Sequence, residues 1–192
     1  MEKKITYFEK PGGEENTQKT LSLAKARAEE LGIKTVVVAS TVGDTAVKAV
    51  DVFKGFKVII VSHVPGMRGP NTQEFTEENR KIVEKKGGLI VTAAHAFGAI
   101  HRSLGAPGGP PAPSSAIGDI IAMALRAFGQ GMKVACECAA MAADAGLVRV
   151  DEEIISIGGT GRGADTAVVL QPSYSHRYFD LRVKEIICKP RM

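Results

Sequence analysis

The sequence predicts an α/β fold in which a largely parallel sheet is flanked by helices. Apolar runs rich in β-branched residues at 35–39, 57–61 and 88–92 have the length and composition of buried strands. Together with a weaker run at 5–8, they alternate with segments of helical periodicity. Successive strand–helix–strand units form parallel sheets with right-handed crossovers. The 192 residues suffice for one domain, 1–192.

The first unit begins with a short strand and a helix. Residues 5–8 alternate only weakly between apolar and polar side chains, which is typical of a strand near a sheet edge. Apolar side chains then recur at helical spacing up to Leu31, and Gly32 ends the helix. We expect Asn16 or Thr17 to be the N-cap, since each carries a side-chain oxygen that can accept a backbone N–H.

Two further helices link the second, third and fourth strands. The turn at 40–45 opens a helix that stops at Gly55. The next helix is highly charged and has a narrow apolar stripe, and we expect it to run from Asn71 or Thr72 to Lys86.

The middle of the chain predicts helices around one irregular segment. Residues 93–101 suggest a short helix, and 105–113 is dense in proline and glycine, which is typical of a surface loop or lid within the same domain. Ser114 or Ser115 is the expected N-cap of an amphipathic helix. The small side chains of the helix at 132–145 favour close packing against a neighbour.

The C-terminal part predicts two strands joined by a glycine loop, followed by a last strand. The runs 155–157 and 167–170 are apolar, and 158–165 lies between them. In 178–188, apolar and polar residues alternate, which indicates a half-solvated strand that we expect to pair in antiparallel fashion.

The glycine loop is a candidate anion site. Glycines let backbone N–H groups form a concavity around a ligand, and an arginine within the loop can neutralise a phosphate. The loop lacks the Gly-Lys-Ser/Thr of a P-loop, and a strand rather than a helix follows it. A tight connection with one exposed arginine is the alternative. The candidate residues are Gly159, Thr160, Gly161, Arg162 and Gly163.

Several polar loops are expected to meet at the carboxyl edge of the sheet, where open α/β sheets bind ligands. These loops are 9–17, 40–45, 62–70, 92–101 and 158–165.

The 40–45 loop can bind an anion through free N–H groups, hydroxyls and the positive end of the helix dipole. Alternatively, Thr41 or Asp44 only caps the helix. The candidate residues are Ser40, Thr41, Gly43 and Thr45.

No catalytic set emerges from spacing. His63 and His95 each follow a strand, but no third ligand completes a metal site, and His176 is expected at the surface. There is no Gly-x-Ser-x-Gly elbow for a hydrolase. Asp44 and Asp165 could pair as carboxylates, although Asp165 could equally hold the turn of the glycine loop.

Composition excludes two classes of partner. The net charge is only +4, aromatic residues make up 5%, and there is no tryptophan, so we expect no nucleic-acid binding. No apolar stretch approaches the roughly 20 residues that span a bilayer, so we expect no membrane insertion. Cys136, Cys138 and Cys188 match neither a disulfide nor a zinc pattern, and we expect buried thiols in a cytoplasmic protein.

The chain resembles the C-terminal domain of pyruvate kinase. Residues 35–46 are similar to the strand, loop and helix of that domain, in which a Thr/Ser/Gly turn holds a phosphate of the allosteric sugar. The fuller resemblance is to stand-alone proteins described as pyruvate kinase alpha/beta-domain-like, and it extends over essentially the whole chain. The segments that carry it are 11–17, 141–147, 158–166 and 184–190.

The resemblance implies a three-layer α/β/α fold with a mixed sheet whose last core strand is antiparallel. It also implies a small phosphorylated ligand at the carboxyl edge, with FMN as the cofactor that members can carry. His95 and Phe97 are then expected near the ring or sugar of that ligand. Pyruvate kinase activity is not implied, because its chemistry belongs to a barrel domain that has no counterpart in these residues.

Three functions remain open at this point. The first is a protein that binds FMN or another phosphorylated ligand and can act as a flavin-dependent oxidoreductase. The second is a regulatory module that binds a phosphorylated metabolite without turnover, and the third is a scaffold with a vestigial site. We also expect a homo-oligomer, with the C-terminal strand or the helix at 132–145 as the possible contacts.

Overall fold

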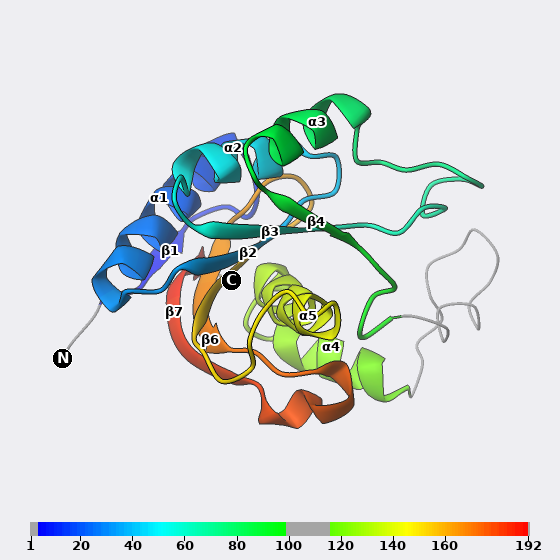
Figure 1. Cartoon of the computed structure of the whole chain (residues 1–192). Coiled ribbons are helices and arrows are strands. Elements are labelled where there is room, and N and C mark those ends of the chain that lie inside the picture. Colours follow the sequence, from blue (N-terminus) through cyan, green and yellow to red (C-terminus); the bar gives the residue numbers. More distant parts are fainter. Residues whose placement is uncertain (1–3, 99–115, 192) are drawn as a thin grey trace.

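The computed structural model describes residues 4–98 and 116–191, and its strands form one seven-stranded sheet (Figure 1). The strand order across the sheet is β1-β7-β6-β5-β2-β3-β4. The strand bounds are β1 (Thr6–Phe8), β2 (Thr35–Ala39), β3 (Lys57–Ser62), β4 (Leu89–Thr92), β5 (Ile154–Gly158), β6 (Thr166–Gln171) and β7 (Arg182–Pro190).

Strand directions confirm the predicted mixed and mostly parallel sheet. β5, β2, β3 and β4 pair in parallel, and β1 pairs in parallel with β7 at the other side. β6 is antiparallel to both of its neighbours, β5 and β7, so the C-terminal strand makes the predicted antiparallel pairing. The carboxyl ends of β1 to β5 therefore meet at one edge of the sheet.

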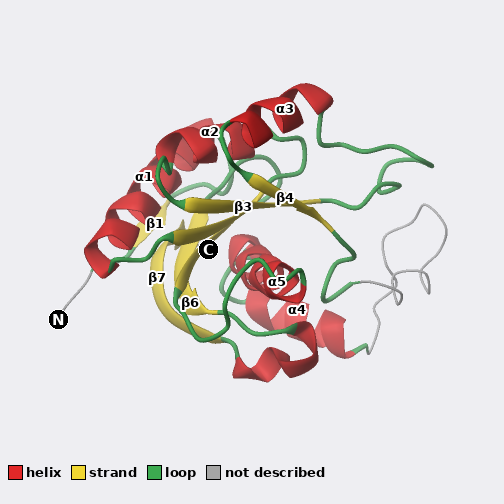
Figure 2. Cartoon of the chain, in the orientation of Figure 1, coloured by secondary structure: helices red, strands yellow, loops and turns green. Residues whose placement is uncertain are grey.

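Helices cover both faces of the sheet and complete the predicted α/β/α layers (Figures 1 and 2). On one face lie α1 (Glu14–Leu31), α2 (Asp44–Val52) and α3 (Glu77–Lys85), and on the other α4 (Ile117–Arg126) and α5 (Gln130–Asp144). A bilayer-spanning helix would have to be longer and more apolar than any helix in the described part of the chain.

The central side chains of β2 are all apolar because both faces of this strand are covered by helices. Val36 and Val38 belong to the core beneath α1 and α2, whereas Val37 belongs to the core beneath α5. Successive residues of a strand point to opposite faces, so a strand covered on both faces buries all of its central side chains, and apolar residues suit these positions.

Helix α1 begins earlier than the sequence predicts. Gly13 occupies the N-cap position, so the prediction of Asn16 or Thr17 as the cap is wrong. The Asn16 amide donates to two carbonyl groups of the preceding loop, each at 2.7 Å. The Thr17 hydroxyl accepts the N–H of Ala164 at 2.9 Å. Both side chains hold loops together instead of capping the helix.

Helix α3 begins at Glu77, and its cap is Thr76, whose hydroxyl accepts an N–H of the first turn at 3.2 Å. The prediction of Asn71 or Thr72 as the cap is therefore wrong. The Thr72 hydroxyl instead donates to the Gly69 carbonyl at 2.7 Å and closes a turn in the preceding loop.

Residues 93–98, the described part of the helix predicted at 93–101, form a turn. That prediction is wrong for these residues because the Phe97 N–H donates to the carboxylate of Glu137, at 3.0 Å, instead of to a helical carbonyl. The loop predicted at 105–113 and the capping serines 114 and 115 lie outside the described residues. Helix α4 is described from Ile117, with Ala116 in the N-cap position.

The C-terminal strand begins later than predicted. Ser175–Asp180 forms a 3₁₀ helix, η2, and β7 starts only at Arg182. Phe179, which suggested strand alternation together with Leu181 and Val183, is exposed in this 3₁₀ helix. The predicted start of the strand at 178 is therefore wrong, because the alternation of apolar and polar residues extends from the 3₁₀ helix into the strand.

Helix α5 is buried inside the chain. A Cβ at Gly131 would collide with the side chains of Asp165 and Thr166, so the start of the helix lies against the beginning of β6. Its alanines and cysteines fill the core against β5 and β2. The close packing predicted for this helix is confirmed, but it occurs within the chain. The helix is therefore not available for the subunit contact that its small residues suggested.

The buried carboxylate of Asp165 joins the loop after β1 to the glycine loop after β5. Its Oδ2 accepts the N–H of Gly12 at 2.8 Å and the N–H of Thr160 at 3.1 Å. Its Oδ1 accepts the hydroxyl of Thr166 at 2.7 Å. Asp165 holds its turn, as one of the two alternatives predicted, and it does not pair with Asp44, which is 64% exposed.

We expect Asp165→Ala to lower the free energy of unfolding by about 4 kcal/mol, because it leaves two backbone N–H groups and a hydroxyl without their acceptor. Urea denaturation followed by circular dichroism measures the change. The matched control is Asp151→Ala, which removes an exposed carboxylate paired with Arg149 and should cost less than about 0.5 kcal/mol. Equal effects of the two substitutions would contradict this role for Asp165.

Candidate functional site

A cavity of about 730 Å³ opens at the carboxyl edge of the sheet, a size typical of small-molecule sites. Loops that follow all five strands from β1 to β5 contribute to its wall, as predicted, together with side chains of α4 and α5. The predicted binding residues that line it are Ser40, Thr41, Thr45, His95, Gly159, Gly161, Arg162 and Gly163. Gly43, Phe97 and Thr160 are not part of the lining.

The turn at 40–45 presents the N-terminus of α2 to the cavity. Gly43 is the N-cap, with a φ of 106° that favours glycine. Neither Thr41 nor Asp44 caps the helix through its side chain, so the capping alternative is not what the structure shows. The hydroxyl of Ser40 accepts one N–H of the first turn at 3.2 Å. The other N–H groups of this turn have no partner within the helix.

The glycine loop forms the wall next to the start of α1. Gly163 has a φ of 85°, and a Cβ there would collide with Thr17, so the two segments can approach only at a glycine. The N–H of Gly13 donates to the Arg162 carbonyl at 3.0 Å. The hydroxyl of Thr160 is buried and has no hydrogen-bond partner in the described part of the chain.

The exposed end of the cavity (Thr41, Asp44, Lys48 and Arg162) carries loosely held charges. The guanidinium of Arg162 lies 3.6 Å from Asp44 Oδ2, and the two side chains are 76% and 64% exposed. Lys48, which is 28% exposed, pairs with Glu14, which is 68% exposed. Exposed pairs of this kind contribute at most about 1 kcal/mol, so either cation can change partner at little cost.

The total charge of the lining is nearly balanced. Among the described residues that line the cavity, five are basic and four are acidic: Lys48, Arg68, Arg126, Lys133 and Arg162 against Glu14, Asp44, Glu74 and Glu137. The described lining therefore carries no strong overall field of either sign.

The buried end of the cavity (His63, His95, Lys133 and Glu137) contains fixed charges. Glu137 forms an ion pair with Lys133 one helical turn earlier, and both side chains are almost fully buried. His95 Nδ1 lies 3.5 Å from Glu137 Oε2, but neither ring nitrogen has a hydrogen-bond partner in the described part of the chain. Burial opposes ionisation of Glu137, yet the neighbouring His95 and Lys133 outweigh it and lower its pKa to about 2.

Phe97 supports this end of the cavity from outside its lining. Its ring lies 4.9 Å from that of Tyr178 in an edge-to-face contact, and the Lys133 ammonium lies 5.6 Å from its centre. Phe97 therefore positions Lys133, whereas the resemblance led us to expect it near a ring or sugar of a ligand.

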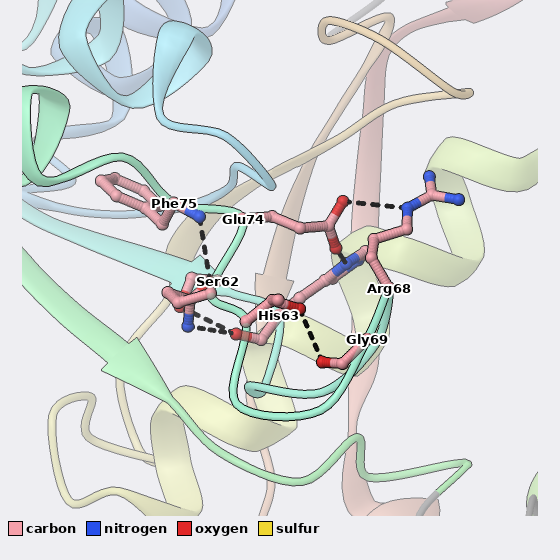
Figure 3. Close-up of polar contacts among 8 residues, drawn as sticks. Ser62, His63, Arg68, Gly69, Glu74 and Phe75 are labelled. Atoms are coloured by element: carbon pink, nitrogen blue, oxygen red, sulfur yellow. Dashed lines mark hydrogen bonds and ion pairs between the residues drawn. The ribbon is translucent and has the colours of Figure 1, made fainter.

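A second histidine, His63, is held by Glu74 (Figure 3). His63 Nδ1 lies 2.9 Å from Glu74 Oε2, and the other carboxylate oxygen accepts from Arg68 Nε at 3.2 Å. The hydrogen bond with His63 lowers the pKa of Glu74 despite its partial burial, so the carboxylate is ionised at neutral pH. The rings of His63 and His95 are 5.3 Å apart.

Sequence reasoning missed Glu74, Lys133 and Glu137. The signal for Lys133 and Glu137 was available, because opposite charges four residues apart are unusual in a helix otherwise made of small apolar residues. Glu74 left no such signal, since it lies in a polar loop that could place it anywhere on the surface.

The cysteines and histidines do not form a metal or nucleophile site in the described part of the chain. All three cysteines are free and buried, as predicted, and burial raises the pKa of Cys136 to about 12. The pKa of Cys138, which lines the cavity, is raised for the same reason. No three potential metal ligands cluster among the described residues, and His176 is exposed against Tyr174.

Comparison with known proteins identifies the family of the chain. The family model described as "Pyruvate kinase, alpha/beta domain" matches residues 18–170, which leaves β1 and β7 outside it. A crystal structure of an O-ureido-L-serine synthase mutant with bound O-ureido-L-serine shares 23% identity, with a TM-score of 0.29. That match covers 56% of this chain and 28% of that one, and a score this low carries no argument.

We expect Glu137→Gln to change how stability depends on pH. Because folding lowers the Glu137 pKa from its ordinary 4.5 to about 2, the ionised form stabilises the fold above pH 4.5, and this contribution disappears as the pH falls towards 2. The contribution is about 3 kcal/mol. At pH 7 the free energy of unfolding of Glu137→Gln should be lower than that of the unmodified protein by about 3 kcal/mol, and this difference should become smaller as the pH falls.

Urea denaturation at several pH values between 7 and 2.5 measures this prediction. Glu78→Gln, at an exposed position of α3, is the control and should follow the unmodified protein throughout. A constant difference between Glu137→Gln and the unmodified protein over the whole range would contradict the prediction.

Proposed function

Because the chain belongs to the pyruvate kinase alpha/beta domain family, we propose that its cavity binds a phosphate-bearing ligand, with FMN as the leading candidate. The observation that carries the proposal is the position of two anion-binding elements in the wall of one cavity. These are the N-terminus of α2, with Thr41 and Thr45, and the glycine loop, with Arg162.

The phosphate end of the ligand belongs at the exposed end of the cavity. The first turn of α2 offers N–H groups and the positive end of a helix dipole, which favour an anion. Arg162 would exchange Asp44 for the phosphate, which it can bind through two parallel hydrogen bonds. Lys48 would add a second cation after leaving Glu14.

The remainder of an FMN molecule is compatible with the rest of the cavity. The volume of the cavity lies within the range of cofactor sites. Apolar side chains line part of the cavity, among them Val42, Met67, Val134 and Met141. The unpartnered nitrogens of His95 would meet polar atoms of the ring or ribityl chain. When bound, FMN supplies a ring that accepts two electrons, which is the basis for proposing a flavin-dependent oxidoreductase.

A regulatory module that binds a phosphorylated metabolite without turnover is the second candidate. It is favoured by helix α4, whose Arg126 lines the cavity while Ile117, Ile120 and Met123 are exposed. A ligand that contacts Arg126 could therefore alter a surface suited to self-association. A homo-oligomer remains a proposal on the same grounds.

We expect Arg162→Ala to weaken FMN binding about tenfold, since it removes a charged hydrogen bond to phosphate. Riboflavin, which lacks the phosphate, should bind both forms equally. Quenching of flavin fluorescence measures both affinities. Arg149→Ala is the control, because Arg149 is also exposed and paired with acidic residues but lies outside the cavity. An equal loss for FMN and riboflavin would contradict the phosphate position.

The absorbance spectrum of the freshly purified protein tests the identity of the ligand. Flavin bands that survive desalting after addition of FMN are the expected result. A colourless protein that also fails to quench added FMN would overturn the flavin proposal and leave the phosphorylated metabolite as the candidate.

For the regulatory candidate, we expect the mass measured by light scattering to change when a phosphorylated ligand is added. Ile120→Glu, on the exposed face of α4, should abolish this change while leaving ligand affinity unchanged. An identical mass with and without bound ligand would exclude regulation through assembly.

A further inference from the structure

Two histidines, each next to a carboxylate, face the cavity from neighbouring strands. His63 follows β3 and His95 follows β4, and these strands pair in parallel with Ser62 opposite Thr92. Both histidines line the cavity, with ring centres 5.3 Å apart and ring planes at 53°. Adjacent atoms of one bound molecule can therefore reach a nitrogen of each ring.

The contact with Glu74 determines which nitrogen of His63 is free. An ionised carboxylate can only accept hydrogen bonds, so His63 Nδ1 must carry the proton that it donates to Glu74 Oε2. In the neutral ring, Nε2 then has a lone pair and can take a proton. Arg68 holds the second oxygen of Glu74 (Figure 3). The Gln73 amide donates to the His63 carbonyl at 3.0 Å.

The environment of His95 is different. Both of its nitrogens are buried without a hydrogen-bond partner among the described residues, although buried polar groups almost always have one. The oxygens of Glu137 are already engaged by Lys133 and by the Phe97 N–H. His95 is thus free to bond to a ligand.

We propose that this buried end of the cavity is a proton-transfer site for a phosphorylated carbonyl compound, with His63 as the proton acceptor and His95 as the hydrogen-bond donor to the carbonyl oxygen. The proposal rests on the phosphate subsite of the function proposed above, but not on FMN as the ligand. Glu74 is a positioning residue that keeps Nε2 of His63 directed towards the cavity.

The step is a reversible enolisation. The C–H bond next to the carbonyl breaks, and its proton moves to His63 Nε2. The electron pair of that bond becomes the carbon–carbon double bond of an enediolate, and the carbonyl oxygen becomes an oxyanion bonded to His95. The Glu74 carboxylate stabilises the imidazolium. Return of a proton from His63 to the same carbon restores the carbon–hydrogen bond and the carbonyl group without any oxidant.

The test uses dihydroxyacetone phosphate in D₂O, because it is a small compound with both a phosphate and a C–H next to a carbonyl. A proton held by His63 Nε2 exchanges with solvent, so deuterium enters the ligand. Loss of the C–H signal in proton NMR measures the rate. We expect exchange with the purified, flavin-free protein, and we expect FMN to suppress it by competing for the phosphate subsite.

Substitutions separate the roles of the two histidines from that of Glu74. His63→Gln should lower the exchange rate roughly a hundredfold or more, and His95→Gln should lower it as well. Glu74→Gln should lower it about tenfold, because an amide can also donate and no longer imposes one tautomer. Nitrogen-15 NMR of the ring should show Nδ1-protonated His63 in the unmodified protein and a mixture of tautomers in Glu74→Gln. His176→Gln, at an exposed histidine outside the cavity, should change nothing.

The outcomes discriminate between this inference and the function proposed above. No exchange by a protein that binds dihydroxyacetone phosphate or FMN overturns proton transfer and leaves the two histidines as ligand-binding groups only. Exchange that persists in His63→Gln also overturns it, because the activity then comes from another group or a contaminant. Absence of binding to either phosphorylated compound overturns the phosphate subsite, and the inference that rests on it fails as well.

Discussion

The cavity depends on the carboxylate of Asp165. Its oxygens accept hydrogen bonds from the loop after β1 and from the glycine loop after β5, although β7 and β6 lie between those two strands in the sheet. No strand pairing could hold these loops together, so a buried acceptor performs that task. Helix α5 also lies against Asp165, which is possible because Gly131 has no side chain at the point of contact. Asp165 therefore contributes both to the wall of the cavity and to the packing of α5.

The two ends of the cavity differ in how firmly their charges are held. Arg162 and Asp44 are mostly exposed, so water screens their attraction and a ligand can separate them. Glu137 and Lys133 are almost fully buried, where charges interact strongly and neither can lose its partner at low cost. In the functions proposed here, the exposed end captures the phosphate and the buried end holds polar groups in a fixed geometry.

Much of the fold and part of the site could be predicted from local pattern. Continuous apolar runs identified the buried strands, and the direction of parallel strands placed their following loops at one edge. The capping predictions failed at Asn16 and Thr72, because side chains of this type bond equally well to loop carbonyls. The turn at 93–98 could not be predicted, since it depends on the carboxylate of Glu137, a residue remote in sequence.

The sequence by itself determined the α/β class, the edge where ligands are expected, and the glycine loop and 40–45 turn as anion-binding candidates. These follow from periodicity and from backbone rules that act within a few residues. Only the tertiary structure decided that His63 is held by Glu74 and that His95 and Lys133 share Glu137. The His63 and His95 rings approach each other only because β3 and β4 are neighbours in the sheet. The position of each histidine just after a strand suggested that the two could meet, but the contact itself depends on which strands are neighbours in the sheet.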